Sequence, residues 1–144
     1  MVSINVFTVG GLRCSIYRNP DFTDYVSSQV TYSLDLTLNP TYNSYFSTED
    51  KLYSFTCQGL IRTEYNGLYN FTVATNKNVN VFMEDVLMLD KPASIKEESS
   101  FQTEMFKNRL VLFEIRLWDD DVRPEYDSSR GYLQVYESSG NIEK

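Results

Sequence analysis

A run of residues that alternates between apolar and polar side chains constrains the fold of this chain more than any other feature. The apolar members share one parity: Val30, Tyr32, Leu34, Leu36 and Leu38. The polar members occupy the other parity: Thr31, Ser33, Asp35 and Thr37. Because successive side chains of a strand point to opposite faces of a sheet, this period of two predicts a strand whose apolar face lies in the core.

Shorter apolar runs, with turn residues between them, recur along the rest of the chain. These runs cover residues 4–9, 12–17, 52–62, 68–74, 79–83, 86–89, 110–118 and 132–136. Two of them predict a shared face each: one for Tyr53, Phe55 and Cys57, the other for Tyr69, Phe71 and Val73. Many short strands with frequent turn signals are typical of antiparallel sandwiches and barrels. We therefore predict an all-β fold, an antiparallel β-sandwich of about nine strands.

Turn residues predict how some of these strands connect. Asn66-Gly67 is the strongest hairpin signal, because both residues readily adopt a positive φ. Glu84-Asp85 stands between two apolar runs and predicts a second tight hairpin. Gly10-Gly11 separates the first run from the second, and Gly59 predicts a bulge within the run from 52 to 62.

Two segments do not follow this pattern. The apolar spacing within residues 95–107 fits neither a strand nor a helix well, so a loop and one short helix both stay open. Residues 138–144 are polar, and we predict a flexible tail there. No internal repeat, low-complexity tract or linker divides the chain, so residues 1–144 are predicted to form a single domain.

Composition excludes several classes of function. The net charge of −7, with only 13 Lys and Arg residues spread along the chain, disfavours binding to nucleic acid or to an anionic membrane. The chain has no histidine, and so lacks the commonest general base and zinc ligand. We predict that the protein is not an enzyme and has no catalytic residue and no cofactor. No apolar segment is long enough to span a bilayer, and the N-terminal residues lack the pattern of a signal peptide.

Two cysteines, Cys14 and Cys57, lie in different predicted strands. A disulfide between them and a pair of reduced thiols are both compatible with the sequence. We favour two small buried thiols, because free cysteine is among the most buried residue types.

One part of the chain carries a more specific signal. Residues 53–59, Tyr-Ser-Phe-Thr-Cys-Gln-Gly, resemble a Phe-Ser-Val-Arg-Trp-Thr-Gly motif, with Cys57 in place of the tryptophan. Residues 67–71, Gly-Leu-Tyr-Asn-Phe, match a Gly-x-Tyr-Thr-Phe motif, and residues 79–90 continue the match as the hairpin that follows. These motifs resemble the protective-antigen-fourteen domain family.

This resemblance implies a β-sandwich that is usually extracellular. In flocculins and epithelial adhesins of the family, two adjacent aspartates hold a calcium ion through which the domain binds sugars. Along the ungapped match these two positions fall on Asn76 and Lys77. Lysine offers only hydrogen-bond donors and a positive charge, whereas calcium requires several oxygen ligands. The resemblance therefore implies that the calcium-dependent site is lost or moved, and we predict no metal ligand.

An acidic cluster, Asp119-Asp120-Asp121, follows Trp118 at the end of an apolar run. It is either a relocated calcium or sugar site, with Trp118 as a stacking surface, or a solvated loop. We favour the solvated loop, because three consecutive aspartates lack the spacing of a calcium-binding EF-hand loop.

Together these observations predict a non-catalytic binding module, carbohydrate-binding or adhesin-like, whose partner is a glycan or another protein. The alternative is a structural or assembly protein of a surface, fibre, virion or complex, which uses the sandwich for protein–protein contacts. The predicted ligand-binding residues are Asn76, Lys77, Trp118, Asp119, Asp120 and Asp121. An extracellular or particle-surface location is implied by the resemblance alone.

Overall fold

The structure, a computed structural model, describes residues 6–32, 54–75, 77–95, 97–118 and 133–143. These residues form two antiparallel sheets, and the described part of the chain contains no helix that is long and apolar enough to cross a membrane. The strands are β1 (Val6–Tyr17), β2 (Tyr25–Thr31), β3 (Ser54–Thr63), β4 (Asn66–Thr75), β5 (Asn78–Met83), β6 (Val86–Lys91), β7 (Ser99–Met105), β8 (Val111–Trp118) and β9 (Leu133–Glu143).

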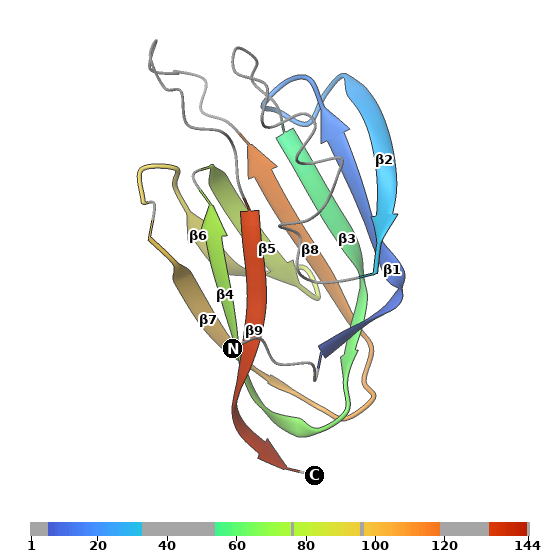
Figure 1. Ribbon diagram of the computed structural model, residues 1–144, viewed down its shortest axis with the longest axis vertical. Coiled ribbons are helices and arrows are strands. Elements are labelled where there is room, and N and C mark those ends of the chain that lie inside the picture. The colour runs from blue at the N-terminus through green and yellow to red at the C-terminus, as the bar shows by residue number, and fades with distance from the viewer. Residues whose placement is uncertain (1–5, 33–53, 76, 96, 119–132, 144) are drawn as a thin grey trace.

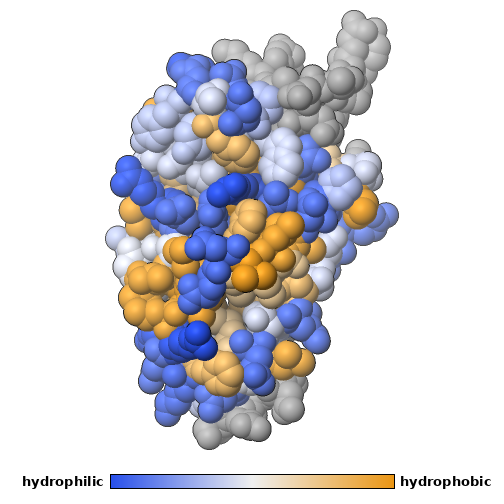
Figure 2. Space-filling model, turned by 180° about the vertical axis from the view of Figure 1, so that it is seen from behind, coloured by the Kyte–Doolittle hydropathy of each residue, from blue (hydrophilic) through white to orange (hydrophobic). Residues whose placement is uncertain are grey.

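The two sheets lie face to face as a β-sandwich (Figure 1). The larger sheet has the strand order β2-β1-β3-β8-β5-β6, and the smaller has the order β7-β4-β9. The predicted all-β sandwich is confirmed. On the outer face of the larger sheet, apolar side chains gather across the middle and polar side chains surround them (Figure 2).

The core lies between the sheets and uses alternate residues of the central strands. Phe55, Cys57 and Ile61 of β3 are buried, as are Phe113, Ile115 and Leu117 of β8. From the smaller sheet β4 contributes the side chains of Tyr69, Phe71 and Val73. The faces predicted for Phe55, Cys57, Tyr69, Phe71 and Val73 are confirmed, and the ring of Phe71 stacks on that of Phe101 in β7 with 5.3 Å between centroids.

Strand β1 runs through Gly10-Gly11, where the sequence predicts a break between two strands. Val9 pairs with Leu60 and Arg13 with Gln58, so three residues of β1 face Gly59 alone. The extra residues belong to β1, and β3 pairs with β8 in unbroken register through Gly59, so the bulge predicted in the run 52–62 lies in the partner strand. A Cβ atom at Gly59 would lie 2.7 Å from the carbonyl oxygen of Gly11, so a side chain there has no space. The bulge bends β1 without ending it.

Strand β2 differs from the strand predicted by the alternating run. Val30 of β2 and Tyr32, just after it, are 45% and 75% exposed, so the prediction that their side chains enter the core is wrong. The reason is position: β2 lies at the edge of the larger sheet, beyond the part that the three-stranded sheet covers. Residues 33–38 lie outside the described residues.

The two predicted hairpins have opposite outcomes. Glu84 and Asp85 both have positive φ, 49° and 64°, and join β5 to β6, which confirms this hairpin. The hairpin predicted at Asn66-Gly67 is wrong. Asn66 and Gly67 instead begin β4, which pairs with β7 and β9, while β3 pairs with β1 and β8. The chain crosses from one sheet to the other at this point.

Two segments that the sequence leaves without regular structure are strands. Within residues 95–107, β7 pairs with β4 from Ser99 to Met105, so the short helix is not formed. The flexible tail predicted over 138–144 is wrong for residues 138–143, because β9 pairs with β4 as far as Glu143. Backbone pairing with the central strand of the smaller sheet outweighs the polar local sequence.

The cysteines are oxidised, which corrects the expectation of two thiols. Cys14 and Cys57 are direct neighbours across the β1–β3 pair and form a disulfide, at a sequence separation of 43. Both are completely buried in the core. The bond therefore connects two adjacent strands of the larger sheet from within the sandwich.

Candidate functional site

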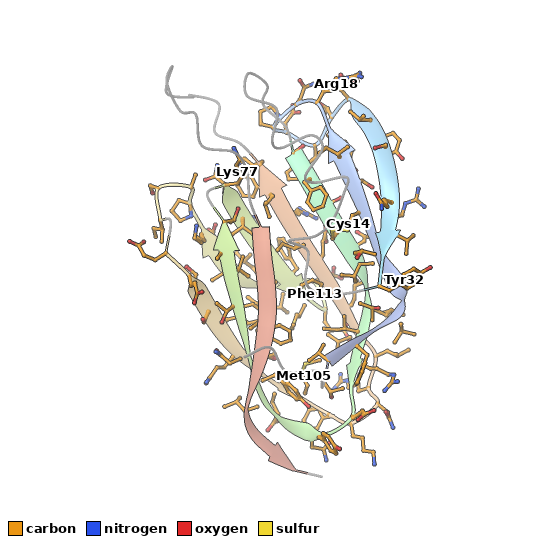
Figure 3. All side chains as sticks on the ribbon, viewed as in Figure 1. Cys14, Arg18, Tyr32, Lys77, Met105 and Phe113 are labelled. Carbon is orange, nitrogen blue, oxygen red and sulfur yellow. A yellow bond between two sulfur atoms is a disulfide. The ribbon has the colours of Figure 1, made fainter. Side chains whose placement is uncertain are left out.

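One end of the sandwich gathers the residues with the most varied chemistry. The β1–β2 turn (18–24), the first residues of β3 and β5, and the last residues of β4, β6 and β8 meet there (Figures 1 and 3). Trp118 pairs with Ser54 on one side and with Asn78 on the other. The structure thus brings two predicted residues, Trp118 and Lys77, to the same end. The other four, Asn76 and Asp119 to Asp121, lie outside the described residues.

Trp118 is half-buried and held by its neighbours. The side-chain amide of Asn78 donates to the carbonyl oxygen of Trp118 at 3.4 Å, and the oxygen of that amide accepts from the Ala93 N–H at 2.8 Å. The ring of Phe22 meets the indole edge to face, with 6.1 Å between centroids. One indole face is therefore supported by protein, and the orientation of the side chain is set before any ligand arrives.

Phe22 reaches Trp118 because its turn is fixed by hydrogen bonds. The residue has a positive φ of 63°, and its N–H donates to the Ser54 hydroxyl oxygen at 3.0 Å. That hydroxyl donates in turn to the carbonyl oxygen of Asn19 at 2.6 Å. A single buried serine thus satisfies two backbone groups of the β1–β2 turn.

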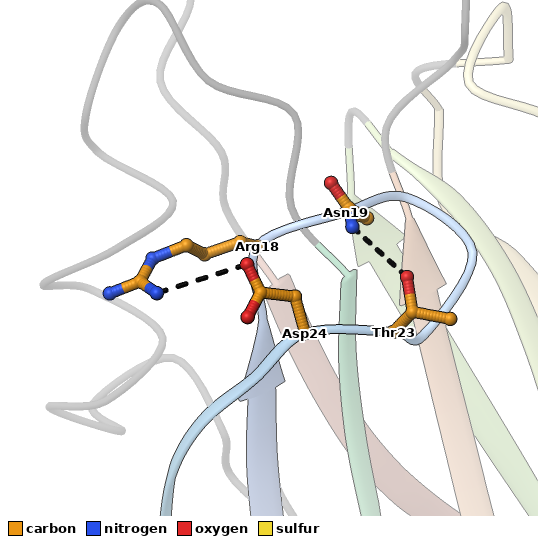
Figure 4. A network of polar contacts seen from close by, with 4 residues as sticks. All are labelled: Arg18, Asn19, Thr23 and Asp24. Carbon is orange, nitrogen blue, oxygen red and sulfur yellow. Dashed lines mark hydrogen bonds and ion pairs between the residues drawn. The ribbon is translucent and has the colours of Figure 1, made fainter.

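The outer part of the same turn is polar (Figure 4). The Asn19 amide donates to the Thr23 hydroxyl at 3.0 Å, and the Arg18 guanidinium lies 3.8 Å from the Asp24 carboxylate. Both members of this ion pair are more than half exposed, so its contribution to stability is small. The turn presents amide, hydroxyl and charged groups to solvent beside the aromatic pair.

Two lysines are buried at this end. Lys77 is 4% exposed, and its N–H donates to the Thr75 hydroxyl oxygen at 3.2 Å. Lys91 is 1% exposed, and its ammonium donates to the carbonyl oxygen of Thr75 at 2.8 Å. Burial lowers the pKa of Lys91 below its ordinary value of 10.5, and the attraction of the Glu97 carboxylate opposes this shift. Cationic side chains are therefore built into the end of β4.

Acidic side chains do not gather here in the part of the chain that the structure describes. No group of three Asp, Glu or Cys side chains among those residues is arranged to hold a metal ion. What the described residues offer is an aromatic face, neutral amides and hydroxyls, and buried ammonium groups.

Sequence reasoning missed Lys91, Phe22 and Ser54. Lys91 could have been found, because it shares the parity of Leu89 and pairs with buried Val79, which places a lysine at an inward position of a strand. Phe22 and Ser54 gave no signal. Their roles depend on the turn folding back over the first residue of β3.

Neither a protein-family model nor a curated protein sequence matches the chain. Solved structures do. The A domain of epithelial adhesin 9 from Candida glabrata, in complex with Galb1-3GlcNAc, matches with a TM-score of 0.62 over 96% of this chain and 85% of that one, at 12% identity. The PA14 (protective-antigen-fourteen) domain of the MpAFP antifreeze protein matches with a TM-score of 0.61, over 96% of this chain and 86% of the other, also at 12% identity.

This chain has the fold of a PA14 domain. Each match covers 96% of this chain, in agreement with the resemblance noted from residues 53–59 and 67–71. The same fold occurs inside larger proteins. A β-glucosidase from Kluyveromyces marxianus, in complex with glucose, matches with a TM-score of 0.65 at 14% identity over 90% of this chain, which spans only 16% of that enzyme. At these identities the likeness shows the PA14 fold alone.

Proposed function

We propose that this chain is a non-catalytic module that binds carbohydrate, without calcium, at the end of the sandwich around Trp118. The proposal is supported by the PA14 fold, which it shares with an adhesin domain solved in complex with a disaccharide. It is also supported by the local chemistry. An oriented indole with polar groups beside it suits a sugar, whose apolar face stacks on the ring while its hydroxyls bond to the amides and hydroxyls.

The single observation that carries the calcium-free part of the proposal is the bond from Lys91 to Thr75. Calcium is a hard cation that collects six to eight oxygen ligands, backbone carbonyls among them. Here the ammonium of Lys91 takes the carbonyl oxygen at the end of β4, and buried Lys77 follows two residues later. Two positive side chains in this position repel a divalent cation, and the ammonium of Lys91 occupies the carbonyl oxygen that such a cation would use.

The non-catalytic part of the proposal is supported by the groups present at this end. A glycoside hydrolase needs one carboxylic acid that stays protonated because a cleft desolvates it. The described carboxylates here, Asp21 and Asp24 of the β1–β2 turn and Glu97 beside Lys91, are all exposed. Without a histidine in the chain, no imidazole can replace such an acid.

A glycan array, probed with the purified protein in calcium and again in EDTA, tests the proposal. We expect the same glycans to bind in both conditions. Trp118→Ala should abolish binding, and Tyr32→Ala, which removes an exposed aromatic ring just after strand β2, should leave it unchanged. Circular dichroism checks that both variants are folded. No binding in either condition refutes the glycan function, and binding that EDTA abolishes refutes calcium independence.

One observation favours the second candidate, a structural or assembly protein. Strand β2 is an edge strand, and the side chains of its Tyr25 and Val30, and of Tyr32 just after it, are exposed; such an edge pairs readily with another chain. Size-exclusion chromatography with light scattering distinguishes the assembly function from the glycan-binding function. An oligomer that Val30→Lys disperses favours assembly, and a monomer over a wide concentration range argues against it.

A further inference from the structure

A cavity lined by methionine lies away from the Trp118 end. The chain has four methionines, and three of them, Met83, Met88 and Met105, line this one cavity of about 240 Å³. It lies between the β5–β6 hairpin, the end of β7 and the start of β8. Met105 marks this region in Figure 3, with Lys77 at the other end of the sandwich. Because methionine is unbranched and flexible, such walls can adapt to different apolar groups.

The cavity opens between the edges of the two sheets. Strand β6 ends the larger sheet, β7 ends the smaller one, and the two strands contact each other. Because these two edges lie on the same side of the sandwich, a further strand beside β7 would lie next to the mouth of the cavity. Every second side chain of that strand would then point inward.

Strand β7 has the regularity that such pairing requires. It pairs with β4 from Ser99 to Met105 without a shift of register, and among the described residues its other edge has no partner strand. The outward N–H and C=O groups of a regular edge can bond to an incoming strand, while pockets for alternate side chains give specificity.

Strand β6, in contrast to β7, has an irregular edge. Val81 pairs with Leu89 and Phe82 with Leu87, so Met88 is an extra, bulged residue. A bulge interrupts pairing along an edge and turns a side chain in a new direction. Here the bulged residue lines the cavity, so β6 supplies a wall for the incoming side chain, and β7 supplies the backbone.

The mouth of the cavity combines apolar and acidic groups. Val86 and Phe106 line it and are 58% and 45% exposed. Around them the exposed carboxylates are those of Glu84 and Glu104, which line the cavity, and of Asp85 next to Glu84. The Arg109 guanidinium lies over the Phe106 ring, 6.0 Å from its centroid. Basic residues in a partner would complement this rim, whereas a second copy of this acidic chain would repel it.

We propose that β7 and the methionine-lined cavity bind an extended segment of a partner protein. The segment pairs with β7 as a fourth strand of the smaller sheet and inserts one large apolar side chain, leucine, methionine or phenylalanine, between Met88 and Met105. Lysine or arginine residues beside this anchor lie against Glu84 and Glu104. This site is separate from the proposed glycan-binding end around Trp118, so one domain can bind a partner protein and a glycan at the same time.

A displayed library of random ten-residue peptides, selected on the full chain, tests the proposal. We expect enrichment of peptides with an apolar anchor next to lysine or arginine. The best synthetic peptide should lose affinity about tenfold or more when its anchor is alanine, a change that leaves the protein untouched. Hydrogen exchange should show protection of β7 amides on binding.

Three protein variants locate the site. Met88→Glu and Glu104→Lys should each weaken binding of the selected peptide about tenfold or more. Asp21→Lys, a matched charge reversal in the β1–β2 turn at the far end, should not. Urea unfolding establishes that each variant is folded. Enrichment without an apolar anchor, equal binding by all variants, or self-association through β7 in sedimentation velocity without peptide enrichment overturns the proposal.

Discussion

Reducing the Cys14–Cys57 disulfide should remove a large part of the stability of this domain. The bond closes a loop with a sequence separation of 43 residues. In the chain-entropy treatment, a loop of this length lowers the entropy of the unfolded chain by about 13 cal/mol/K, or about 4 kcal/mol at 25 °C. Typical domains are stable by about 5–15 kcal/mol, so the loss is a substantial fraction of the total.

The assay is equilibrium unfolding in urea, followed by the fluorescence of Trp118, the only tryptophan of the chain. Three proteins are compared: the oxidised chain, the reduced chain, and the C14A/C57A variant. The reduced chain keeps both sulfur atoms in the core and so isolates the effect of the cross-link. It should lose about 4 kcal/mol, which corresponds to about 13 °C in Tm for a chain of this length.

The alanine variant adds a packing effect to the loss of the cross-link. Both cysteines are completely buried, so truncation to alanine leaves space in the core and should lower the free energy of unfolding further. We therefore expect the order oxidised, reduced, double alanine, from most to least stable. A reduced chain within about 1 kcal/mol of the oxidised one would refute the loop-closure argument. A C14A/C57A variant as stable as the reduced chain would refute the packing argument.

Three further predictions concern single positions. Gly59→Ala should cost about 1–3 kcal/mol in urea unfolding, because the new Cβ meets the carbonyl oxygen of Gly11 at 2.7 Å; a neutral substitution would mean that the bulge moves freely. Phe113→Ala should cost about 3–5 kcal/mol, since the ring is fully buried between the sheets, and a cost below about 1 kcal/mol would place Phe113 outside the core. The pKa of Lys91 in the folded chain lies below the 10.5 of the unfolded chain, so between these two pH values the unfolded state binds more protons. The free energy of unfolding, measured relative to that of Lys91→Met, should therefore rise toward pH 10.5. A difference between the two proteins that stays constant with pH would contradict the burial of Lys91.

The sequence predicts best those strands that have one face in the core and one face toward solvent. Alternation correctly placed Phe55 and Cys57 of β3 and Tyr69, Phe71 and Val73 of β4, because each pattern reports a real difference in burial. The same rule failed for Val30 and Tyr32. An alternating pattern shows that a strand can present an apolar face, but the number of strands in the opposite sheet decides whether that face is covered.

Connections and polar strands were harder to predict for a different reason. Asn66-Gly67 permits a sharp change of direction, but local turn chemistry is the same whether the next strand returns beside β3 or crosses to the other sheet. Residues 138–143 carry no apolar pattern, and only pairing with β4 makes them a strand. Both outcomes depend on partners distant in sequence, which a local pattern does not contain.

For the candidate site, the sequence selected Lys77 through the ungapped match and Trp118 through its place at the end of an apolar run, and the structure brings both to one end of the sandwich. The supporting residues were not predictable in this way. Phe22 reaches the indole through a turn with positive φ, and Lys91 reaches Thr75 across the space between two strand ends.

The pairing of β4 also determines when the domain can complete its folding. Synthesis runs from the N-terminus, and β4 leaves the ribosome well before its second neighbour, since Asn66 pairs with Glu143. During that interval one edge of the central strand stays open to other nascent chains, which makes misassembly a hazard. Pairings between residues so far apart in sequence also slow folding, so this domain should depend on molecular chaperones more than a helical protein of equal size.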